Sequence, residues 1–466
     1  MVTTPSLIEE PGTLRPMLRL AMPVLLEQIL GMAVWFSDRL LTGHYLDTPH
    51  LAAITLMAYV LWLVWGIFSV VAIGGTAMVA RFVGAGDWAA ARHVLHQAVL
   101  IGATLAVLAT LAGFAWGDRV AVALQLHGET AELATTYLRC MLPVIPLMML
   151  QTVGIACLRG AGDMVSGLVI MGVVNLVNIA VSWALVLGLG PLPALGWQGI
   201  ALGTAAGFAV GGVLVAALLL RGRWGLWCEW RRFRPNRGLI RRLLRIGLPG
   251  GADMLSIIGC QLWFIALINR LGAVALAAHG VALCVESLAF MPGTAFQVSA
   301  TTLVGQALGA NDPRRAARSV HAALLWGGGV MVLAGLFIYP NALLLAGLFV
   351  RGEHGHVAEL AAPLLRTVSL AMPALAVTMV LNGALRGAGD TRWPLLFSLI
   401  GFLGVRIPLT CWLTQDTVYL PFADVTLAGR NLGVLGAWYA MSADLHVRAL
   451  LAATRFLQGG WKHVRV

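Results

Sequence analysis

Long apolar runs separated by short polar connections dominate the pattern of this chain. A run of about 20 residues suffices to cross the roughly 30 Å hydrocarbon core of a bilayer as a helix. We count twelve such runs, centred near residues 28, 65, 106, 146, 178, 208, 256, 290, 334, 372, 404 and 445. No connection between them is long enough for a soluble domain. The pattern therefore predicts an all-α polytopic membrane protein with twelve transmembrane helices.

Composition supports a membrane protein. Of the 466 residues, 59% are hydrophobic and only 11% are charged, whereas soluble domains average about 25% charged residues. The first apolar run, 18–41, is too long for a signal-peptide core and has no small-residue cleavage site after it. We expect it to remain as the first transmembrane helix. The six cysteines show neither metal-ligand spacing nor a disulfide framework.

The positive charge, +11 in total, follows the membrane topology. Nine arginines lie in the central connection against a single acid, Glu229, and other arginines fall in alternate loops. Under the positive-inside rule this places both termini and the central linker in the cytoplasm, which an even helix count allows. Because the positive charge follows the membrane topology and does not form a binding patch, we expect no nucleic-acid partner.

The two halves of the chain repeat each other. Leu-Arg-Gly-Ala-Gly-Asp occurs at 158–163 and again at 385–390, and Gly-Ala-Gly-Asp at 84–87 returns as Gly-Ala-Asn-Asp at 309–312. Leu-Ala-Ala at 51–53 likewise recurs at 276–278. The matches predict an N-lobe at 1–222, an arginine-rich linker at 223–240 and a C-lobe at 241–466. An even number of helices separates the copies, so we predict two six-helix lobes related by a pseudo-twofold axis along the membrane normal. A central cavity between them would serve alternating access.

Several motifs resemble the MATE family of multidrug and toxin exporters. They are Leu-Ala-Met-Pro ending at Pro23, Ser37-Asp38, the segment from Glu286 to Gln306, and both Leu-Arg-Gly-Ala-Gly-Asp loops. The resemblance covers essentially the whole chain. It implies a cation-coupled exporter that exchanges H⁺ or Na⁺ for small organic cations, which are often amphiphilic. We expect no cofactor besides the coupling ion.

The resemblance also gives roles to residues of the N-lobe. It implies that Asp38 is the site of the coupling proton, or of a Na⁺ ion, and that the first helix bends at Pro23. Asn178 resembles the asparagine of the family's N-lobe site, and Asn175 lies on the same helix face. Ser182 stands where the family often has an aspartate, which weakens a Na⁺ site and favours H⁺. The alternative for Asp38 is an acid at a helix end paired with Arg39, although adjacent helical residues point apart.

Other polar residues inside the spans are candidates for the coupling site or the substrate cavity. Acids in the hydrocarbon region are costly and are functional candidates by default, and Glu286 has no basic neighbour one helical turn away. We therefore predict that it is a C-lobe proton or substrate-charge site. Glu27 and Asp253, at matching positions of the two halves, either line a cytoplasmic vestibule or are solvated first-turn acids. The remaining cavity candidates are Gln28, Trp35, Gln261 and His279.

These observations predict a multidrug exporter of the bacterial inner membrane, working as a monomer. A flippase for a lipid-linked oligosaccharide, from the same wider superfamily, is the alternative. It should line its cavity with arginine, whereas the acids recognised inside these spans suit cationic cargo. We predict that the chain is not an enzyme, because it has no phosphate loop, nucleophile elbow or metal-ligand cluster.

Overall fold

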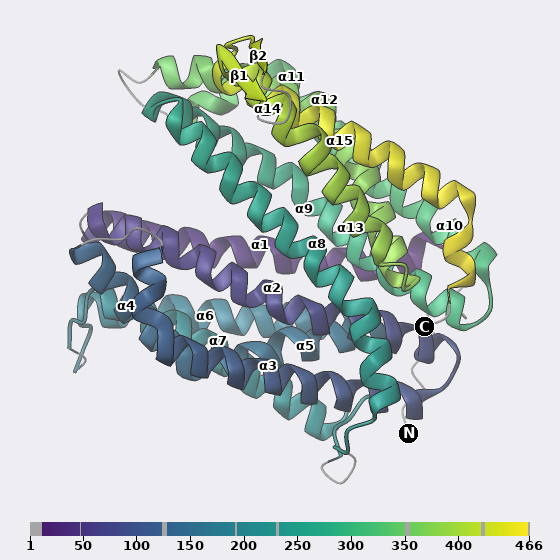
Figure 1. The fold of residues 1–466 in the computed structure, drawn as a ribbon. Helices are drawn as coiled ribbons and strands as arrows, with labels where there is room; N and C mark the ends of the chain where they lie inside the picture. Colours follow the sequence, from purple (N-terminus) through teal and green to yellow (C-terminus); the bar gives the residue numbers. More distant parts are fainter. Residues whose placement is uncertain are drawn as a thin grey trace.

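The structure, a computed structural model, describes residues 12–46, 48–123, 128–191, 193–229, 233–349, 355–420 and 425–464. Helices of membrane-spanning length follow one another through the N-terminal half (Figure 1). They are α1 (Leu14–Tyr45), α2 (Thr48–Gly84), α3 (Trp88–Ala123), α4 (Glu129–Met141) continued by α5 (Ile145–Ala161), α6 (Val165–Leu187) and α7 (Trp197–Arg221). A 3₁₀ turn, Leu142–Val144, joins α4 to α5.

The C-terminal half repeats this order. It contains α8 (Arg237–Arg270), α9 (Ala273–Gly309), α10 (Pro313–Ala323) continued by α11 (Gly329–Gly347), α12 (Gly355–Gly387), α13 (Arg392–Leu399) continued by α14 (Ile407–Thr414), and α15 (Gly433–Gln458). Short π-helical stretches, Leu324–Gly328 and Ile400–Arg406, join the split helices. A 3₁₀ turn, Gly460–His463, follows α15.

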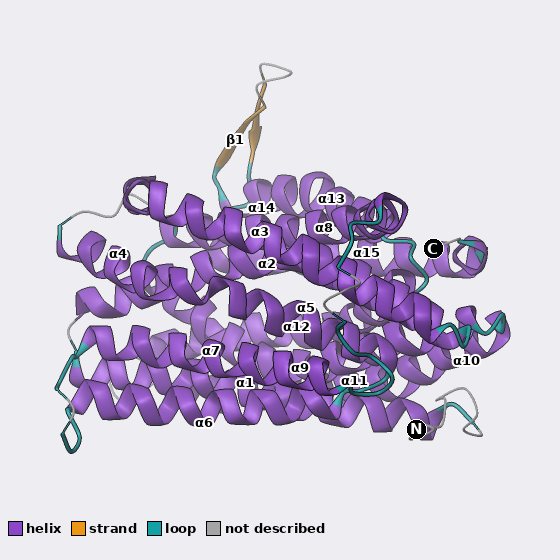
Figure 2. Ribbon diagram, turned by 90° about the horizontal axis from the view of Figure 1, so that it is seen from below, coloured by secondary structure: helices purple, strands orange, loops and turns teal. Residues whose placement is uncertain are grey.

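The twelve predicted spans are confirmed in the described residues. Eleven helical segments are long and apolar enough to cross a membrane. The twelfth, α15, is a helix of 26 residues that contains Asp444, Arg448 and Arg455. The all-α prediction omitted a short antiparallel hairpin, β1 (Thr417–Leu420) with β2 (Val425–Ala428), which projects beside α14 in Figure 2.

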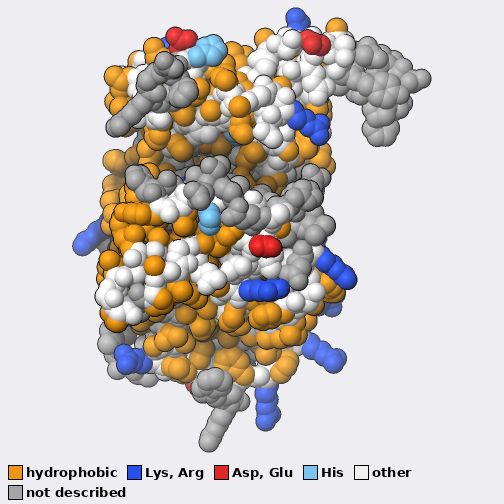
Figure 3. All heavy atoms as spheres, turned by 90° about the vertical axis from the view of Figure 1, so that its left-hand side faces the viewer, with side chains coloured by type: hydrophobic (Ala, Val, Ile, Leu, Met, Phe, Trp, Pro, Cys, Tyr) orange, Lys and Arg blue, Asp and Glu red, His pale blue; other side chains and the backbone are white. Residues whose placement is uncertain are grey.

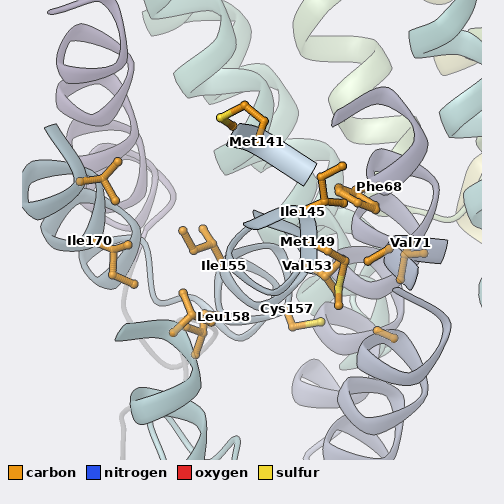
Figure 4. Packing of buried hydrophobic residues seen from close by; sticks show 14 of the residues in the cluster. Phe68, Val71, Met141, Ile145, Met149, Val153, Ile155, Cys157, Leu158 and Ile170 are labelled. Carbon is orange, nitrogen blue, oxygen red and sulfur yellow. The ribbon is translucent and has the colours of Figure 1, made fainter. Parts of the chain in front are cut away.

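The helices form the two predicted lobes, coloured purple to teal and green to yellow in Figure 1. Each lobe has its own apolar core. In the N-lobe, Ile145 and Val153 of α5 lie against Phe68 and Val71 of α2 (Figure 4). Figure 3 views the molecule from the left-hand side of Figure 1 and shows hydrophobic side chains over much of the flanks, as expected for lipid-facing surfaces.

The lobes meet near the end of the molecule that carries both termini (Figure 1). There Met17, Leu20 and Val24 of α1 share a buried cluster with Leu303 and Val304 of α9. Gln28 Nε2 also donates a hydrogen bond to Thr294 Oγ1 across the lobes at 3.1 Å. We call this region the terminal-side contact.

Close helix approach at the terminal-side contact depends on glycine. The last turns of α2 and α9 cross so tightly that a methyl group at Gly84 would overlap the carbonyl of Gln306. Reciprocally, a methyl group at Gly309 would overlap the carbonyl of Arg81. Both pairs obey the 225-residue offset of the repeat. The pseudo-twofold axis therefore passes through this crossing.

The predicted boundaries of lobes and linker remain predictions, although one detail differs. The C-lobe helix α8 begins at Arg237 rather than at residue 241. The side chain of Asn236 caps it, accepting a hydrogen bond from the Leu239 amide at 3.1 Å, as expected of an asparagine at a helix start.

Candidate cation site and buried ion pairs

Glu27 and Asp253 are buried and paired with arginine. Arg159 donates to both carboxylate oxygens of Glu27 at 2.6 Å, and Arg386 donates to Asp253 Oδ2 at 2.6 Å. Glu27 is 4% exposed and Asp253 is fully buried. These acids are therefore neither solvated first-turn residues nor free charges of an open vestibule. They fix the repeated Leu-Arg-Gly-Ala-Gly-Asp loops to the first helix of each lobe.

The aspartates that end the same loops pair with a second set of arginines. Asp163 accepts from Arg223 Nε at 3.1 Å, and Asp390 accepts from Arg455 Nη2 at 2.7 Å. The two arginines lie at the end of the sixth span of each lobe. The arginine and the aspartate of each loop therefore pair with other elements rather than with each other. Each loop instead joins the first and sixth helices of its lobe.

Asp38 is buried on α1, where its side chain meets residues of α6 and α7. It is 7% exposed, and its Oδ2 accepts a hydrogen bond from Thr204 Oγ1 of α7 at 3.3 Å. Asn178 of α6 donates from Nδ2 to the same Thr204 hydroxyl at 3.2 Å. Tyr137, also buried, interacts with both Asp38 and Thr204. None of the ion pairs formed by the described residues involves Asp38.

Several buried oxygen atoms of α1 and α6 lack a partner. Among the described residues these are Asp38 Oδ1, Asn178 Oδ1 and Ser182 Oγ, and, further along α6, Asn175 Oδ1. Asn175 lies one turn from Asn178 and donates to the Leu30 carbonyl at 2.6 Å. Buried polar atoms in folded proteins are nearly always satisfied. A carboxylate among neutral oxygens suits a proton or a hard monovalent cation.

The sequence prediction brought together Asp38, Asn178 and Asn175 but missed Thr204 and Tyr137. Thr204 is a single hydroxyl in an apolar helix, which by itself predicts nothing. The equivalent position in the C-lobe carries no matching motif that could have identified Thr204 as a site residue. A sequence signal existed only for Asp38, Asn178 and Ser182, through their resemblance to the family pattern.

The C-lobe holds a different set of charges. Asp444 of α15 is fully buried and accepts from Arg448 at 2.9 Å on each oxygen. Arg406, 6% exposed, forms a second ion pair with Asp444 at 2.8 Å. Glu286 of α9 interacts electrostatically with Arg406, although its own Oε2 is buried without a hydrogen bond in the described residues. Glu286 has no basic residue one helical turn away on α9, and Arg406 belongs to a different segment, the π-helical stretch before α14.

Asp444 and Arg448 are the functional candidates that the sequence analysis overlooked. Their spacing of four residues inside an apolar run was a usable signal, since such residues lie on one helix face. Arg406 could not be connected to either acid without knowing how α15 packs against the π-helical stretch before α14.

The remaining predicted residues occupy varied positions. His279 is 2% exposed, and its Nδ1 accepts a hydrogen bond from Trp438 Nε1 at 3.2 Å, so it packs inside the C-lobe. Gln28 joins the lobes, as described above, and Gln261 is partly exposed. Pro23 lies inside α1, which continues through it. The side chain of Trp35 lies outside the described part of the structure.

Comparisons with known proteins agree with this architecture. The MatE family profile matches residues 23–184 and 249–412, one match in each lobe. A probable multidrug resistance protein NorM of Thermotoga maritima is 27% identical over 464 residues, covering 97% of this chain and 94% of the relative. One of the same name from Rhodopseudomonas palustris is 30% identical, with 94% and 90% covered.

A solved structure has the same fold. The outward-facing conformation of a multidrug resistance MATE transporter of the MOP superfamily superposes with a TM-score of 0.88 at 20% identity, covering all of both chains. The family profile covers well over half of the present sequence, in two matches separated as its repeats are. On this evidence the chain belongs to the MatE family of multidrug efflux transporters, and it is a transporter rather than an enzyme.

Proposed function

We propose that this chain exports cationic, amphiphilic organic compounds by antiport with H⁺ or Na⁺, and that Asp38 is the carboxylate that binds the coupling cation. The observation that carries this proposal is the environment of Asp38. There a buried carboxylate with no arginine partner in the described residues accepts a hydrogen bond from Thr204, and the side-chain oxygens of Asn178 and Ser182 on the adjacent helix are unsatisfied. Such an acid is stable in the membrane interior only when a proton, a metal cation or a cationic substrate compensates it.

We favour H⁺ over Na⁺ as the coupling ion. The site contributes one carboxylate, because Ser182 supplies only a hydroxyl at the place where the family often has a second acid. A dehydrated Na⁺ requires several well-placed oxygens, whereas a proton needs only the carboxylate itself. Asn178 and Thr204 would then orient the carboxyl group and hold it in either protonation state.

The two-lobe arrangement supports alternating access. The lobe-to-lobe hydrogen bonds from Gln28 to Thr294, from Thr302 to the Arg159 carbonyl and from Gln306 to the Gly160 carbonyl all belong to the terminal-side contact. Since α1 carries both Asp38 and this contact, a change in its geometry on cation binding would reach the lobe interface. Rocking about such an interface is the usual mechanism of transporters built from repeats.

We also propose that the protein works as a monomer in a bacterial inner membrane, with both termini in the cytoplasm. Arginines of the central connection, among them Arg237, Arg241 and Arg245, lie at the start of α8, and the positive-inside rule assigns such a cluster to the cytoplasmic side. The terminal-side contact would then be the closed cytoplasmic gate.

Transport by inverted membrane vesicles tests this function. Uptake of ethidium, a fluorescent organic cation, is measured under an imposed pH gradient and, separately, under a Na⁺ gradient. We expect wild type to be driven by the pH gradient and Asp38→Asn to abolish this uptake. Glu359→Gln is the matched control, because Glu359 is an exposed acid near the start of α12.

The outcomes separate the alternatives. Uptake driven only by Na⁺ would make Asp38 a Na⁺ ligand, and Ser182→Ala should then weaken the apparent Na⁺ affinity. Uptake that survives Asp38→Asn would remove this residue from the coupling site. Failure of both gradients to move ethidium would contradict export of organic cations.

A further inference from the structure

A short segment that follows α15 reaches from the C-lobe to the N-lobe. Residues 459–464, which we call the α15 arm, contain the 3₁₀ turn Gly460–His463. Arg81, near the end of α2, donates a hydrogen bond from Nη2 to the carbonyl of Val464 at 3.1 Å. The donor belongs to the N-lobe, and the acceptor follows the last helix of the C-lobe. The arm therefore takes part in the contact between the lobes.

A tryptophan fixes the α15 arm to the C-lobe. Trp461 is fully buried, and its ring stacks on that of Phe456 of α15, with 5.1 Å between the ring centres and 12° between the planes. Its Nε1 donates to the Phe456 carbonyl at 2.9 Å. Gly459, with a φ of 72°, adopts the left-handed conformation that turns the chain back onto α15. We therefore expect the arm to move with the C-lobe.

The anchor of the arm lies inside the terminal-side contact. Trp461 belongs to the buried cluster that also contains Met17 of α1 and Leu303 of α9, and Figure 1 marks the end of the chain where the two lobes meet. Arg81 lies at the crossing of α2 and α9, where its backbone carbonyl faces Gly309. The hydrogen bond between Arg81 and the arm thus spans two surfaces that must separate when the lobes rock apart at this end.

The repeat shows that Arg81 occupies a position that forms contacts between the lobes. An offset of 225 residues relates Arg81 to Gln306. Gln306 donates from Nε2 to the carbonyl of Gly160 in the opposite lobe at 3.0 Å, whereas Arg81 finds its acceptor in the α15 arm. The connection that follows α7 instead packs on its own lobe, where Arg92 lies 3.7 Å from the centre of the Trp227 ring. The arm is therefore an asymmetric addition to a repeated interface.

We propose that the α15 arm is a latch that holds the terminal-side contact closed. This inference rests on the proposed alternating access, in which that contact is the cytoplasmic gate. When the lobes separate there, Trp461 stays with α15 and Arg81 stays with α2, so the link through Val464 must break. A hydrogen bond from a charged donor contributes more than a neutral one. Loss of this link should therefore favour the open state.

The reactivity of a buried cysteine measures how often the gate opens. Ala21 of α1 is 1% exposed within the cluster of the terminal-side contact. Ala21→Cys is introduced into a chain whose six native cysteines are replaced by alanine, and a hydrophilic maleimide is added to the purified protein. Because the reagent reaches this cysteine only in the open state, the reaction rate follows the open population when opening and closing are fast.

Substitutions of Arg81 test the link to the N-lobe. Arg81→Met removes the donor and should raise the reaction rate about tenfold. Arg81→Lys keeps a charged donor and should react more slowly than Arg81→Met. Arg318→Met is the matched control, because Arg318 is an exposed arginine of α10, and it should react at the wild-type rate. An unchanged rate in Arg81→Met would overturn the inference.

A second background shows whether Arg81 acts through the arm. Trp461→Ala releases the arm from α15 and should itself raise the rate. Arg81→Met added to Trp461→Ala should then have little further effect, because the arm no longer connects the lobes. An equal effect of Arg81→Met in both backgrounds would mean that Arg81 acts independently of the arm, which also overturns the inference. Trp461→Leu takes the place of Trp461→Ala if the smaller residue prevents folding.

Gly84→Leu separates a failure of the latch from a failure of the gate. It should push α2 away from the Gln306 backbone and accelerate the reaction whatever the state of the arm. If Gly84→Leu accelerates the reaction and Arg81→Met does not, the latch is overturned and the proposed gate stands. If neither variant accelerates it, the proposed opening at this end is overturned together with the latch.

Discussion

Arg386 donates a hydrogen bond to Asp253 at 2.6 Å, and both side chains are almost completely buried. The same contact joins Arg159 to Glu27 in the other lobe. The two halves of the chain therefore preserve an ion pair, although one half uses aspartate and the other glutamate.

Loss of one partner of this pair should destabilise the protein strongly. Asp253→Asn leaves the Arg386 guanidinium buried without its anion, and we expect the free energy of unfolding to fall by about 3–5 kcal/mol. The measurement is thermal unfolding of the purified protein in detergent. Arg223→Gln is the control, because the Arg223 side chain is 45% exposed and its loss should cost much less. Equal losses in the two variants would contradict the importance of burial here.

A larger side chain at the crossing of α2 and α9 should open the terminal-side contact. Gly84→Leu would push the Gln306 backbone away, so a cysteine introduced in place of the fully buried Ala80 should react with a maleimide at least about tenfold faster. Gly259→Leu on α8 is the control, since no atom lies within 4 Å of a Cβ atom added there. Unchanged reactivity in the Gly84 variant would mean that the contact accommodates the leucine.

Replacement of Pro23 should impair coupled transport more than replacement of Pro249, the equivalent residue of the C-lobe. Proline cannot donate the helical hydrogen bond to the residue one turn earlier, so α1 can bend there more easily than elsewhere. We expect Pro23→Ala to reduce gradient-driven ethidium transport at least about fivefold, with little change in ethidium binding. Pro249→Ala makes the same change within α8, which carries Phe264 at the position equivalent to Asp38, 226 residues later. Similar transport defects in both variants would argue against a specific hinge in α1.

The Cys228 thiol, in the connection between α7 and α8, should be unreactive near neutral pH. Burial disfavours the thiolate and raises the pKa of Cys228 to about 11. At pH 8 the thiolate fraction should be about 100-fold below that of a thiol with a pKa near 9. Maleimide labelling of a variant in which Cys228 is the sole cysteine, followed from pH 7 to pH 10, measures this. The rate should still be rising steeply at pH 10, and a half-maximal rate near pH 9 would contradict the raised pKa.

The fold was predictable because span hydropathy and repeated motifs are local features of the sequence. Twelve spans and the two-lobe arrangement follow from them, and even α15 was recognised despite Asp444 and Arg448. The partners of charged residues were not predictable in the same way. Glu27 is separated from Arg159 by four helix connections, so only the packed lobe shows that these residues meet.

The candidate site was predicted only in part, because some of its residues meet only in the packed lobe. Asp38 and Asn178 were found through their resemblance to a known pattern, whereas Thr204 has no signature of its own. Glu286 was recognised as an acid in an apolar helix. Its neighbour Arg406 comes from a π-helical stretch whose extra residue per turn alters which side chains share a face, and helical periodicity in the sequence does not reveal that change.

The crossing of α2 and α9 has a consequence for the origin of the chain. Gly84 meets Gln306 and Gly309 meets Arg81, so each half presents to the other the patch that it receives. An interface with this property is isologous, as in a twofold-symmetric homodimer. A single ancestral half-length protein could therefore have paired with itself through the same surface before gene duplication and fusion. The later divergence of Asp38 and Phe264 required two copies of the half-length gene, because a homodimer must carry the same residue at both positions.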